Sequence, residues 1–136
     1  MSILLDTHVF LWAAGLNGRL SDSARSLLGN PDQAIFFSAV SSWEIAIKWS
    51  KRRLDLPAKP VDFVGNVIAA SGISQLAVTV RDSCAVAELP FHHNDPFDRM
   101  LVAQARTNRL RIMTADPMIE KYDVDVIALW LNEDDE

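Results

Sequence analysis

The chain has 136 residues, a length that fits one domain better than two. With 49% hydrophobic and 23% charged residues it can form a core without disulfides, which excludes disordered, collagen-like and disulfide-scaffold proteins. The net charge is −5, but residues 133–136 are all acidic, so the rest of the chain is nearly neutral. We therefore expect a single domain over residues 1–131 and an acidic, disordered, solubilising tail over residues 132–136.

The single cysteine and the first residues both favour an intracellular protein. Cys84 has no partner for an internal disulfide, which suits a reducing cytoplasm, and we expect it to be a buried apolar side chain. Residues 1–5 meet Asp6 too early for an export signal, and no basic region precedes them. No apolar run approaches the roughly 18 residues that span a bilayer. We therefore expect a cytoplasmic protein with no membrane partner.

Strand and helix patterns alternate along the chain. Short apolar runs without a period predict buried strands, and apolar residues three and four positions apart predict helices. In chain order, we expect a strand at 2–5, helices at 9–13 and 21–29, a strand at 34–37, helices at 41–51 and 61–70, a strand at 76–80, helices at 82–88 and 96–107, a strand at 111–114, a helix at 117–122 and a strand at 126–128. This alternation predicts a three-layer α/β/α sandwich with a central parallel sheet of four to five strands.

Acidic residues recur where predicted strands end and helices begin. Asp6 ends the first strand, and Glu44 lies in the first turn of the helix after the second strand. Asp95 and Asp98 open a later helix, and Asp116 follows a late strand. Because the carboxyl ends of parallel strands share one edge of a sheet, we expect these side chains to lie close together.

Several of these acids also have a purely structural explanation. Ser41 and Glu44 match a capping box, in which the acid reaches back to the first residue of the helix. Asp95 and Asp116 each precede a proline, as helix N-caps do. Asp6 follows a buried strand without such a pattern, where an unpaired carboxylate is costly. Asp6 is therefore the strongest functional candidate when each acid is considered alone.

Carboxylates from four strand and helix junctions that share one edge need a counter-charge. Carboxylates about 5 Å apart repel by roughly 3 kcal/mol per pair at an effective dielectric constant near 20. Oxygen ligands, without a Cys or His cluster at zinc spacing, favour Mg²⁺ or Mn²⁺, which would hold a phosphodiester and activate water. Two groups of basic residues could bind flanking phosphates or could be ordinary solvated helix faces. They are Lys48, Lys51, Arg52, Arg53 and Lys59, and Arg99, Arg106, Arg109 and Arg111.

Other residues near these acids carry weaker signals. His92 and His93 lie in a polar loop before Asp95, where we favour orientation of the loop over metal ligation or proton transfer. We expect His8 to pack or to support a neighbouring ligand. The tryptophans are expected in the core or in an interface, with RNA stacking as an alternative for the first two. They are Trp12, Trp43, Trp49 and Trp130.

Four segments, in order along nearly the whole chain, resemble the PIN-domain family, and in particular its bacterial VapC-like toxin branch. They are Leu4-Leu5-Asp6-Thr7-His8, Ser41-Ser42-Trp43-Glu44-Ile45, His93-Asn94-Asp95-Pro96-Phe97-Asp98-Arg99 and Thr114-Ala115-Asp116. The third segment, which continues into Met100-Leu101-Val102-Ala103-Gln104-Ala105, is the most specific.

The resemblance implies a Mg²⁺- or Mn²⁺-dependent ribonuclease that acts as the toxin of a toxin–antitoxin pair. It implies that the metal-binding and catalytic acids are Asp6, Glu44, Asp98 and Asp116. It also implies supporting roles for Thr7 and Thr114, beside the carboxylates or a metal-bound water, and for Arg99, as a partner of an acid or a phosphate. Asp95 matches a recurrent acid of this branch; we assign it to capping or to support of a ligand, and the resemblance leaves open whether it is itself a ligand. The implied partners are an RNA substrate, a cognate antitoxin whose C-terminal segment occupies the groove, and a second copy in a homodimer.

Three alternatives remain at this point. A phosphatase of the haloacid-dehalogenase type needs a second Asp two residues after its nucleophile, where this chain has His8. A receiver domain needs an early acidic pair and a late Lys after a strand, and neither is evident. A non-catalytic PIN-fold module that docks an antitoxin or RNA would keep the acids as helix caps. Such a module would show no metal-dependent change in stability.

Overall fold

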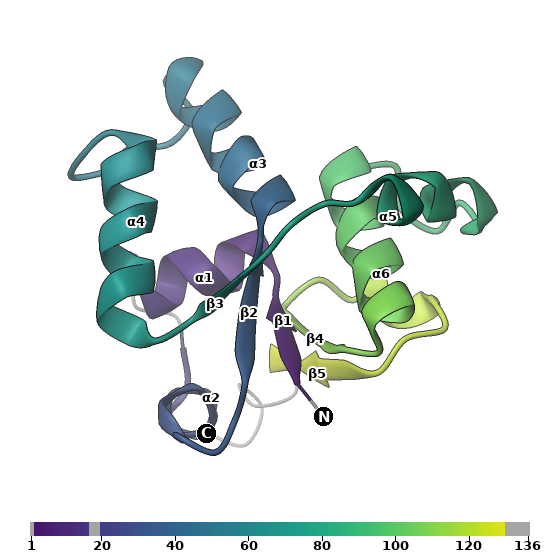
Figure 1. The fold of residues 1–136 in the computed structure, drawn as a ribbon, viewed down its shortest axis with the longest axis horizontal. Coiled ribbons are helices and arrows are strands. Elements are labelled where there is room, and N and C mark those ends of the chain that lie inside the picture. The colour runs from purple at the N-terminus through teal and green to yellow at the C-terminus, as the bar shows by residue number, and fades with distance from the viewer. Residues whose placement is uncertain (1, 17–19, 130–136) are drawn as a thin grey trace.

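The computed structural model describes residues 2–16 and 20–129. Within them, one sheet is formed by β1 (Ile3–Leu5), β2 (Ile35–Ser38), β3 (Ser74–Leu76), β4 (Arg111–Thr114) and β5 (Val126–Ala128). The helices are α1 (Thr7–Ala13), α2 (Asp22–Gly29), α3 (Ala39–Ser50), α4 (Pro60–Ser71), α5 (Val80–Ala85) and α6 (Pro96–Asn108), with short 3₁₀ helices η1 (Val86–Glu88) and η2 (Ile119–Lys121). Figure 1 shows the sheet between two groups of helices.

The described strands pair in parallel, in the order β3-β2-β1-β4-β5. β1 lies in the middle, with Leu4 opposite Phe36 of β2 and Ile112 of β4. Because the strands are parallel, their carboxyl ends share one edge. β1 leads directly into α1 at this edge, and β2 leads into α3. The prediction of a parallel sheet of four to five strands is therefore confirmed.

The side chains of β1 alternate between two hydrophobic cores, one on each face of the sheet. Ile3 and Leu5 pack with residues of α1, α2 and α4, among them Phe10. Leu4 packs instead with α6, where Leu101 is fully buried. Figure 1 shows α1, α2 and α4 on one side of the sheet and α5 and α6 on the other. The predicted three-layer α/β/α sandwich is confirmed, and burial on both faces explains why the strand sequences do not alternate.

The third strand was predicted at residues 76–80, but β3 forms at Ser74–Leu76. The reason is a capping box that starts α5 at Val80. Thr79 Oγ1 accepts a hydrogen bond from the Asp82 backbone N–H (3.0 Å), and the Asp82 carboxylate accepts one from the Thr79 backbone N–H (3.1 Å). Apolar residues that we assigned to a strand therefore lie in the connection and in the first turn of a helix.

The helix predicted at residues 41–51 begins earlier, at Ala39, and the capping box of Ser41 and Glu44 is wrong. Ser38 is the N-cap, because its hydroxyl oxygen accepts from the Val40 backbone N–H at 3.1 Å. Ser41 lies inside the helix. Glu44 consequently belongs to the second turn rather than the first, so capping does not explain its presence.

Several side chains that we expected in the core are exposed. Cys84 lies on the outer side of α5 and is exposed, because Asp82 is the residue of that helix that is buried. Trp43 and Trp49 are also exposed, whereas Trp12 is half-buried. Trp130 and the predicted tail at 132–136 lie outside the described residues, so the domain boundary stays a prediction. None of the helices in residues 2–16 and 20–129 has the length and apolar character of a membrane span.

Candidate active site

Four acidic side chains from four separate segments converge at the carboxyl edge of the sheet. Asp6 follows β1, Glu44 lies in α3, Asp98 lies in the first turn of α6 and Asp116 follows β4. Burial, and then the negative charges of its acidic neighbours, raise the pKa of Asp98 to about 8. In decreasing order of effect, those neighbours are Asp6, Asp95, Glu44 and Asp116. The structure therefore brings together the acids that the sequence placed at one edge.

Asp6 is held by the backbone of α1 and by a hydroxyl from β4. Its side chain caps α1, where Oδ1 accepts from the His8 backbone N–H at 3.3 Å. Its other oxygen accepts a short hydrogen bond of 2.5 Å from Thr114 Oγ1. Asp6 is only 3% exposed, and this burial raises the pKa of its carboxyl while the bond from Thr114 opposes the rise. Thr114 Oγ1 also accepts from the Asp116 backbone N–H (3.0 Å), which links two of the acidic segments.

Glu44 is buried and only partly satisfied. One of its oxygens, Oε2, pairs with Lys48 Nζ at 2.6 Å, one helical turn along α3. In the part of the chain that the structure describes, no group hydrogen-bonds to the other oxygen, Oε1, although it is fully buried. An unpaired buried acceptor is costly, so a second positive or hydrogen-bonding group fits this position.

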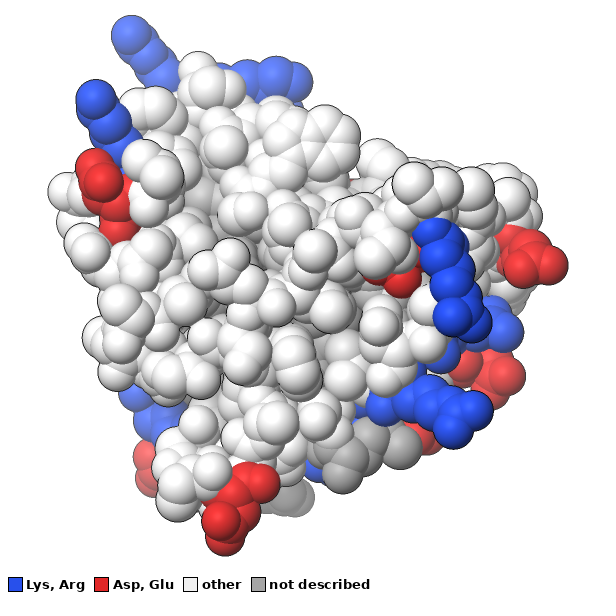
Figure 2. Space-filling view, viewed as in Figure 1, with Lys and Arg blue, Asp and Glu red and all other residues white. Residues whose placement is uncertain are grey.

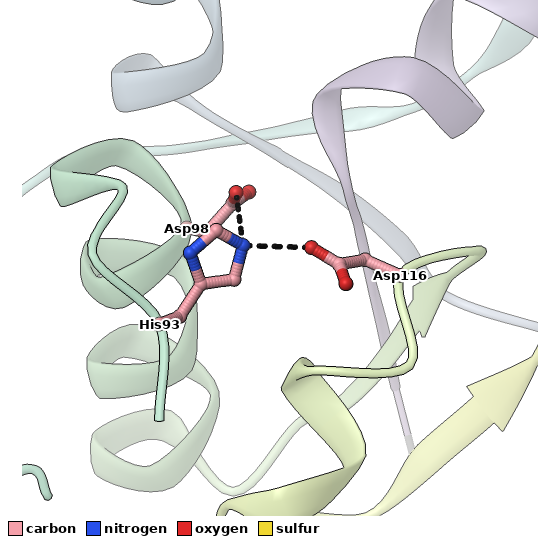
Figure 3. Close-up of side chains that lie close together, drawn as sticks. All are labelled: His93, Asp98 and Asp116. Carbon is pink, nitrogen blue, oxygen red and sulfur yellow. Dashed lines mark hydrogen bonds and ion pairs between the residues drawn. The ribbon is translucent and has the colours of Figure 1, made fainter. Parts of the chain in front are cut away.

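Asp98 and Asp116 form the more open half of the site, and His93 lies between them (Figure 3). His93 Nε2 is 2.7 Å from Asp116 Oδ2 and 3.1 Å from Asp98 Oδ2. One potential ligand atom from each of these residues lies within 4.8 Å of the others. Asp116 Oδ1 accepts from the Met118 backbone N–H at 2.9 Å and closes a turn, so the helix predicted at residues 117–122 is reduced to that turn and η2.

Sequence reasoning underestimated His93. We favoured a role in orienting its loop, and the structure does tie the loop down through the His93 backbone N–H, which donates to Tyr122 Oη at 2.9 Å. The imidazole, however, reaches the acids as well. A histidine shortly before a helix whose first turn carries an acid was the available signal. It was not decisive, because the path of a loop cannot be read from residue spacing.

The structure gives two of the predicted supporting residues clear positions. Asp95 caps α6, where Oδ1 accepts from the backbone N–H groups of Phe97 (2.8 Å) and Asp98 (3.4 Å), so the capping prediction is confirmed. Thr7 is buried and donates to Ser41 Oγ at 2.8 Å, which joins α1 to α3 beside the acids. Both residues therefore fix the backbone that carries the acids.

Arg99 does not have the role that we expected. Its guanidinium is buried and donates to the backbone carbonyls of Pro90 (2.9 Å) and Val86 (3.1 Å), and to Tyr122 Oη (3.3 Å). It also lies over the ring of Phe91, 4.3 Å from the ring centre. These contacts hold the segment before α6. They also occupy the guanidinium of Arg99, so that it does not pair with an acid or a phosphate.

A pocket of about 580 Å³ opens between α1 and α3, next to the buried acids. Its walls are mostly apolar and include Trp12, while Lys48 and Arg53 lie on its lining together with Asp55. Lys48 connects this pocket to the acids through its ion pair with Glu44. Figure 2 shows lysine and arginine side chains gathered around the end of α3 and the loop that follows it.

The second basic group is not part of the site. Arg99 is buried among carbonyls, as described above. Arg106 lies in the last turn of α6, at the opposite end of that helix from Asp98. Arg111 begins β4, so it lies at the amino edge of the sheet, whereas the acids lie at the carboxyl edge. Arg109 is the C-cap of α6, so it too lies at the end of that helix away from Asp98, and the second group is not positioned to hold phosphates next to the acids.

Comparison with known proteins agrees with this geometry. The model of the PIN domain family matches residues 3–125. Ribonuclease VapC22 from Mycobacterium tuberculosis is 25% identical over 122 residues, which cover 89% of this chain and 92% of that protein. VapBC2 from Rickettsia felis, solved bound to a promoter DNA fragment, has a TM-score of 0.71 at 15% identity and covers 94% of this chain and 98% of its own. FitAcB from Neisseria gonorrhoeae has a TM-score of 0.66 at 17% identity, with coverage of 94% and 98%. Because the family match spans the acidic edge and most of the chain, the protein belongs to the PIN domain family.

Proposed function

We propose that the protein is a metal-dependent endoribonuclease and the toxin of a toxin–antitoxin pair. The observation that carries the proposal is the convergence of four acids from four segments, in a chain of the PIN domain family. The similar protein VapC22 is named a ribonuclease, and the similar structures include VapBC and FitAB complexes. Together these similarities favour RNA as the substrate and an antitoxin as a partner.

The side chains at this edge fit Mg²⁺ or Mn²⁺. Carboxylate oxygens are the donors that such hard cations prefer. Within the described residues the buried Glu44 Oε1 is an acceptor without a hydrogen-bond partner, which a cation would contact. Burial, and then the negative charge of neighbouring acids, raises the pKa of Asp98, and a cation would offset both effects. We propose that the ion is held by Asp6, Glu44, Asp98 and Asp116. A bound divalent ion would supply Lewis-acid stabilisation of the phosphoryl charge and an acidified water.

The other residues of the site position these carboxylates. The hydroxyl of Thr114 orients Asp6, and the ammonium of Lys48 holds one oxygen of Glu44. Asp95 fixes the start of α6 and therefore the direction of Asp98. Arg53, on the lining of the neighbouring pocket, is placed to neutralise the phosphates of an RNA strand that enters the site.

RNA cleavage by defined variants tests the proposal. Wild type, Asp98→Asn and Asp6→Asn would be incubated with single-stranded RNA and Mg²⁺ or Mn²⁺. Asp32→Asn is the matched control, since Asp32 is exposed in the turn before β2, at the opposite edge of the sheet. Loss of a residue behind a metal ligand typically costs about 10–100-fold, so loss of a direct ligand should cost at least about 100-fold. Equal cleavage by all four proteins would refute the assignment.

We propose that a cytoplasmic antitoxin protein binds this chain, and that the chain forms a homodimer or a toxin–antitoxin hetero-oligomer. Exposed apolar side chains support a protein partner. Trp43 is 62% exposed and Val61 is 78% exposed, and both line an apolar groove of about 700 Å³ between α3 and α4. If the product of a neighbouring short reading frame is the antitoxin, it will inhibit RNA cleavage at a one-to-one ratio. A lack of inhibition would contradict that assignment.

A further inference from the structure

The imidazole of His93 lies where it could contribute to the proposed metal site in two different ways. By distance alone, Nε2 could be a nitrogen ligand beside Asp98 and Asp116, because potential ligand atoms of the three residues lie within 4.8 Å of one another. Alternatively, Nε2 could carry a proton and donate hydrogen bonds to the carboxylates of Asp116, at 2.7 Å, and Asp98, at 3.1 Å. The two roles need different tautomers of the neutral ring, so the hydrogen bond made by the other ring nitrogen distinguishes them.

That other nitrogen, Nδ1, accepts a hydrogen bond. The backbone N–H of Asp95 donates to His93 Nδ1 at 3.1 Å. A nitrogen that accepts must keep its lone pair, so the neutral ring carries its proton on Nε2. The side of the imidazole that faces Asp98 and Asp116 therefore presents an N–H group. For Nε2 to bind a cation, the proton would have to move to Nδ1, which would then face the N–H of Asp95 without an acceptor.

The hydrogen bond from Asp95 is fixed by the surrounding fold. The Asp95 side chain caps α6, so its backbone N–H is held at the start of a helix that packs into the core. On the other side, the His93 backbone N–H donates to Tyr122 Oη, which also accepts from Arg99. The His93 side chain is 19% exposed. The backbone of His93 is therefore held by Tyr122, and its ring is held by the backbone N–H of Asp95. The tautomer of the ring depends on this second bond, and so on the position at which α6 begins.

We propose that His93 is a positioning residue whose Nε2–H bridges Asp98 and Asp116 and sets their spacing for a cation, and that it is not itself a metal ligand. The inference rests on the proposed function, because it concerns the same site. The two carboxylates come from α6 and from the end of β4, which share no backbone hydrogen bond at this point. The carboxylate oxygens that accept from His93 keep further lone pairs that can bind an ion. On this proposal, the protein atoms that bind the ion are all oxygens.

The tautomer can be measured on the wild-type protein, without any catalytic assay. Nitrogen-15 NMR of the labelled histidine side chains distinguishes a protonated ring nitrogen from an unprotonated one. We expect a proton on Nε2 and none on Nδ1, both before and after Mg²⁺ is added. In a Mn²⁺-loaded sample, pulsed electron paramagnetic resonance should show no directly coordinated nitrogen from His93. A proton on Nδ1, or a manganese-bound nitrogen that disappears in His93→Gln, would overturn the proposal.

Two substitutions separate the donor from the bulk of the ring. His93→Leu removes the N–H but keeps an apolar side chain, and we expect Mg²⁺ affinity, measured by calorimetry, to fall about 10–100-fold. His93→Gln retains a side-chain N–H and should recover most of that affinity. His92→Gln is the control, because His92 packs edge-on against Tyr122 and, within residues 2–16 and 20–129, forms no hydrogen bond or ion pair with the acids. Unchanged affinity in His93→Leu, or equal loss in both His93 variants, would refute the positioning role.

This series also separates the inference from the proposed function. If the protein does not cleave RNA, the NMR and calorimetric results still decide whether His93 donates or ligates. If the acids hold a cation but His93 proves to be a ligand, only the inference fails.

Discussion

The candidate site has two halves that are held in different ways. The inner half, Asp6 and Glu44, is 3% and 2% exposed, and each acid has a protein partner of its own: Thr114 for the first and Lys48 for the second. In the outer half the side chains of Asp98 and Asp116 are 16% and 31% exposed, and the two acids share one partner, His93. The fold therefore fixes the inner carboxylates through separate side-chain partners, whereas the outer pair shares His93 as its side-chain partner, and Asp116 also accepts from the Met118 backbone N–H.

The largest effect is expected from Asp98→Asn, in the outer half. The substitution removes the acid whose pKa is raised by burial and then by the other acids, and it should lower RNA cleavage at least about 100-fold. In the metal-free protein the same change should increase stability, because it removes a carboxyl whose ionisation the site disfavours. Cleavage assays and urea unfolding with a chelator present measure the two effects. A variant that is both inactive and less stable would show that Asp98 has a structural role instead.

The pH dependence of stability tests the raised pKa of Asp98 in a measurement that does not depend on catalysis. The pKa of Asp98 is raised from 3.8 to about 8, so the folded state binds this proton more tightly than the unfolded chain does. The stabilisation is complete below about pH 4 and is lost as the pH rises toward about 8. We therefore expect the unfolding free energy of wild type to fall relative to that of Asp98→Asn as the pH rises from about 4 to about 8. Added Mg²⁺ should reduce that shift, whereas a pH-independent difference would contradict the raised pKa.

Thr114→Val tests the inner half. The change keeps the shape of the side chain but removes the hydroxyl that donates to Asp6 and accepts from the Asp116 backbone N–H. Leaving buried polar groups without a partner costs about 1–3 kcal/mol, and urea unfolding should show a loss of that size. Thr114→Ser, which keeps the hydroxyl, is the matched control. Equal stability of the valine and serine variants would show that the bond to Asp6 adds nothing.

Lys48→Met is expected to lower stability less than Thr114→Val does, and to strengthen metal binding rather than weaken it. Lys48 is 38% exposed in its side chain, so solvent weakens its pair with Glu44 and the stability loss should be about 1 kcal/mol. Removing this ammonium frees the second oxygen of Glu44, and Mg²⁺ should then bind more tightly. Calorimetry on wild type, Lys48→Met and Lys48→Arg measures the change. Weaker binding in Lys48→Met would contradict competition between the ammonium and the ion.

The sequence predicted the sheet edge well because strand ends and helix starts carry local signals. Asp6 after a buried run, and Asp95-Pro96 before a helical pattern, place two segments of the site without any tertiary information. What the sequence missed concerns contacts with distant partners. His93 and Arg99 are joined through Tyr122, which lies after β4, and residue spacing cannot reveal that contact.

Errors in the helix starts have a different cause. Both Ser38 and Ser41 are good N-caps, and the strand that precedes them decides which one is used. In the same way, Thr79 competes with the apolar residues around it and begins α5 where we expected a strand. Local propensity was therefore correct about the presence of a helix in each case, but the first residue was set by the N-cap that the structure uses, Ser38 for α3 and the capping box of Thr79 for α5.

The smallest effect is expected from Asp95→Asn, which separates a helix cap from a metal ligand. Asparagine caps a helix about as well as aspartate, so stability should change by less than about 0.5 kcal/mol and cleavage should remain within a few-fold of wild type. Asp95→Ala, which removes the cap, should cost about 1 kcal/mol and should also loosen the backbone N–H that holds His93. Because the charge of Asp95 contributes to the raised pKa of Asp98, the asparagine variant should lower that pKa, which carbon-13 NMR of the carboxyl measures. A loss of cleavage in Asp95→Asn as large as in Asp98→Asn would instead place Asp95 among the ligands of the outer half.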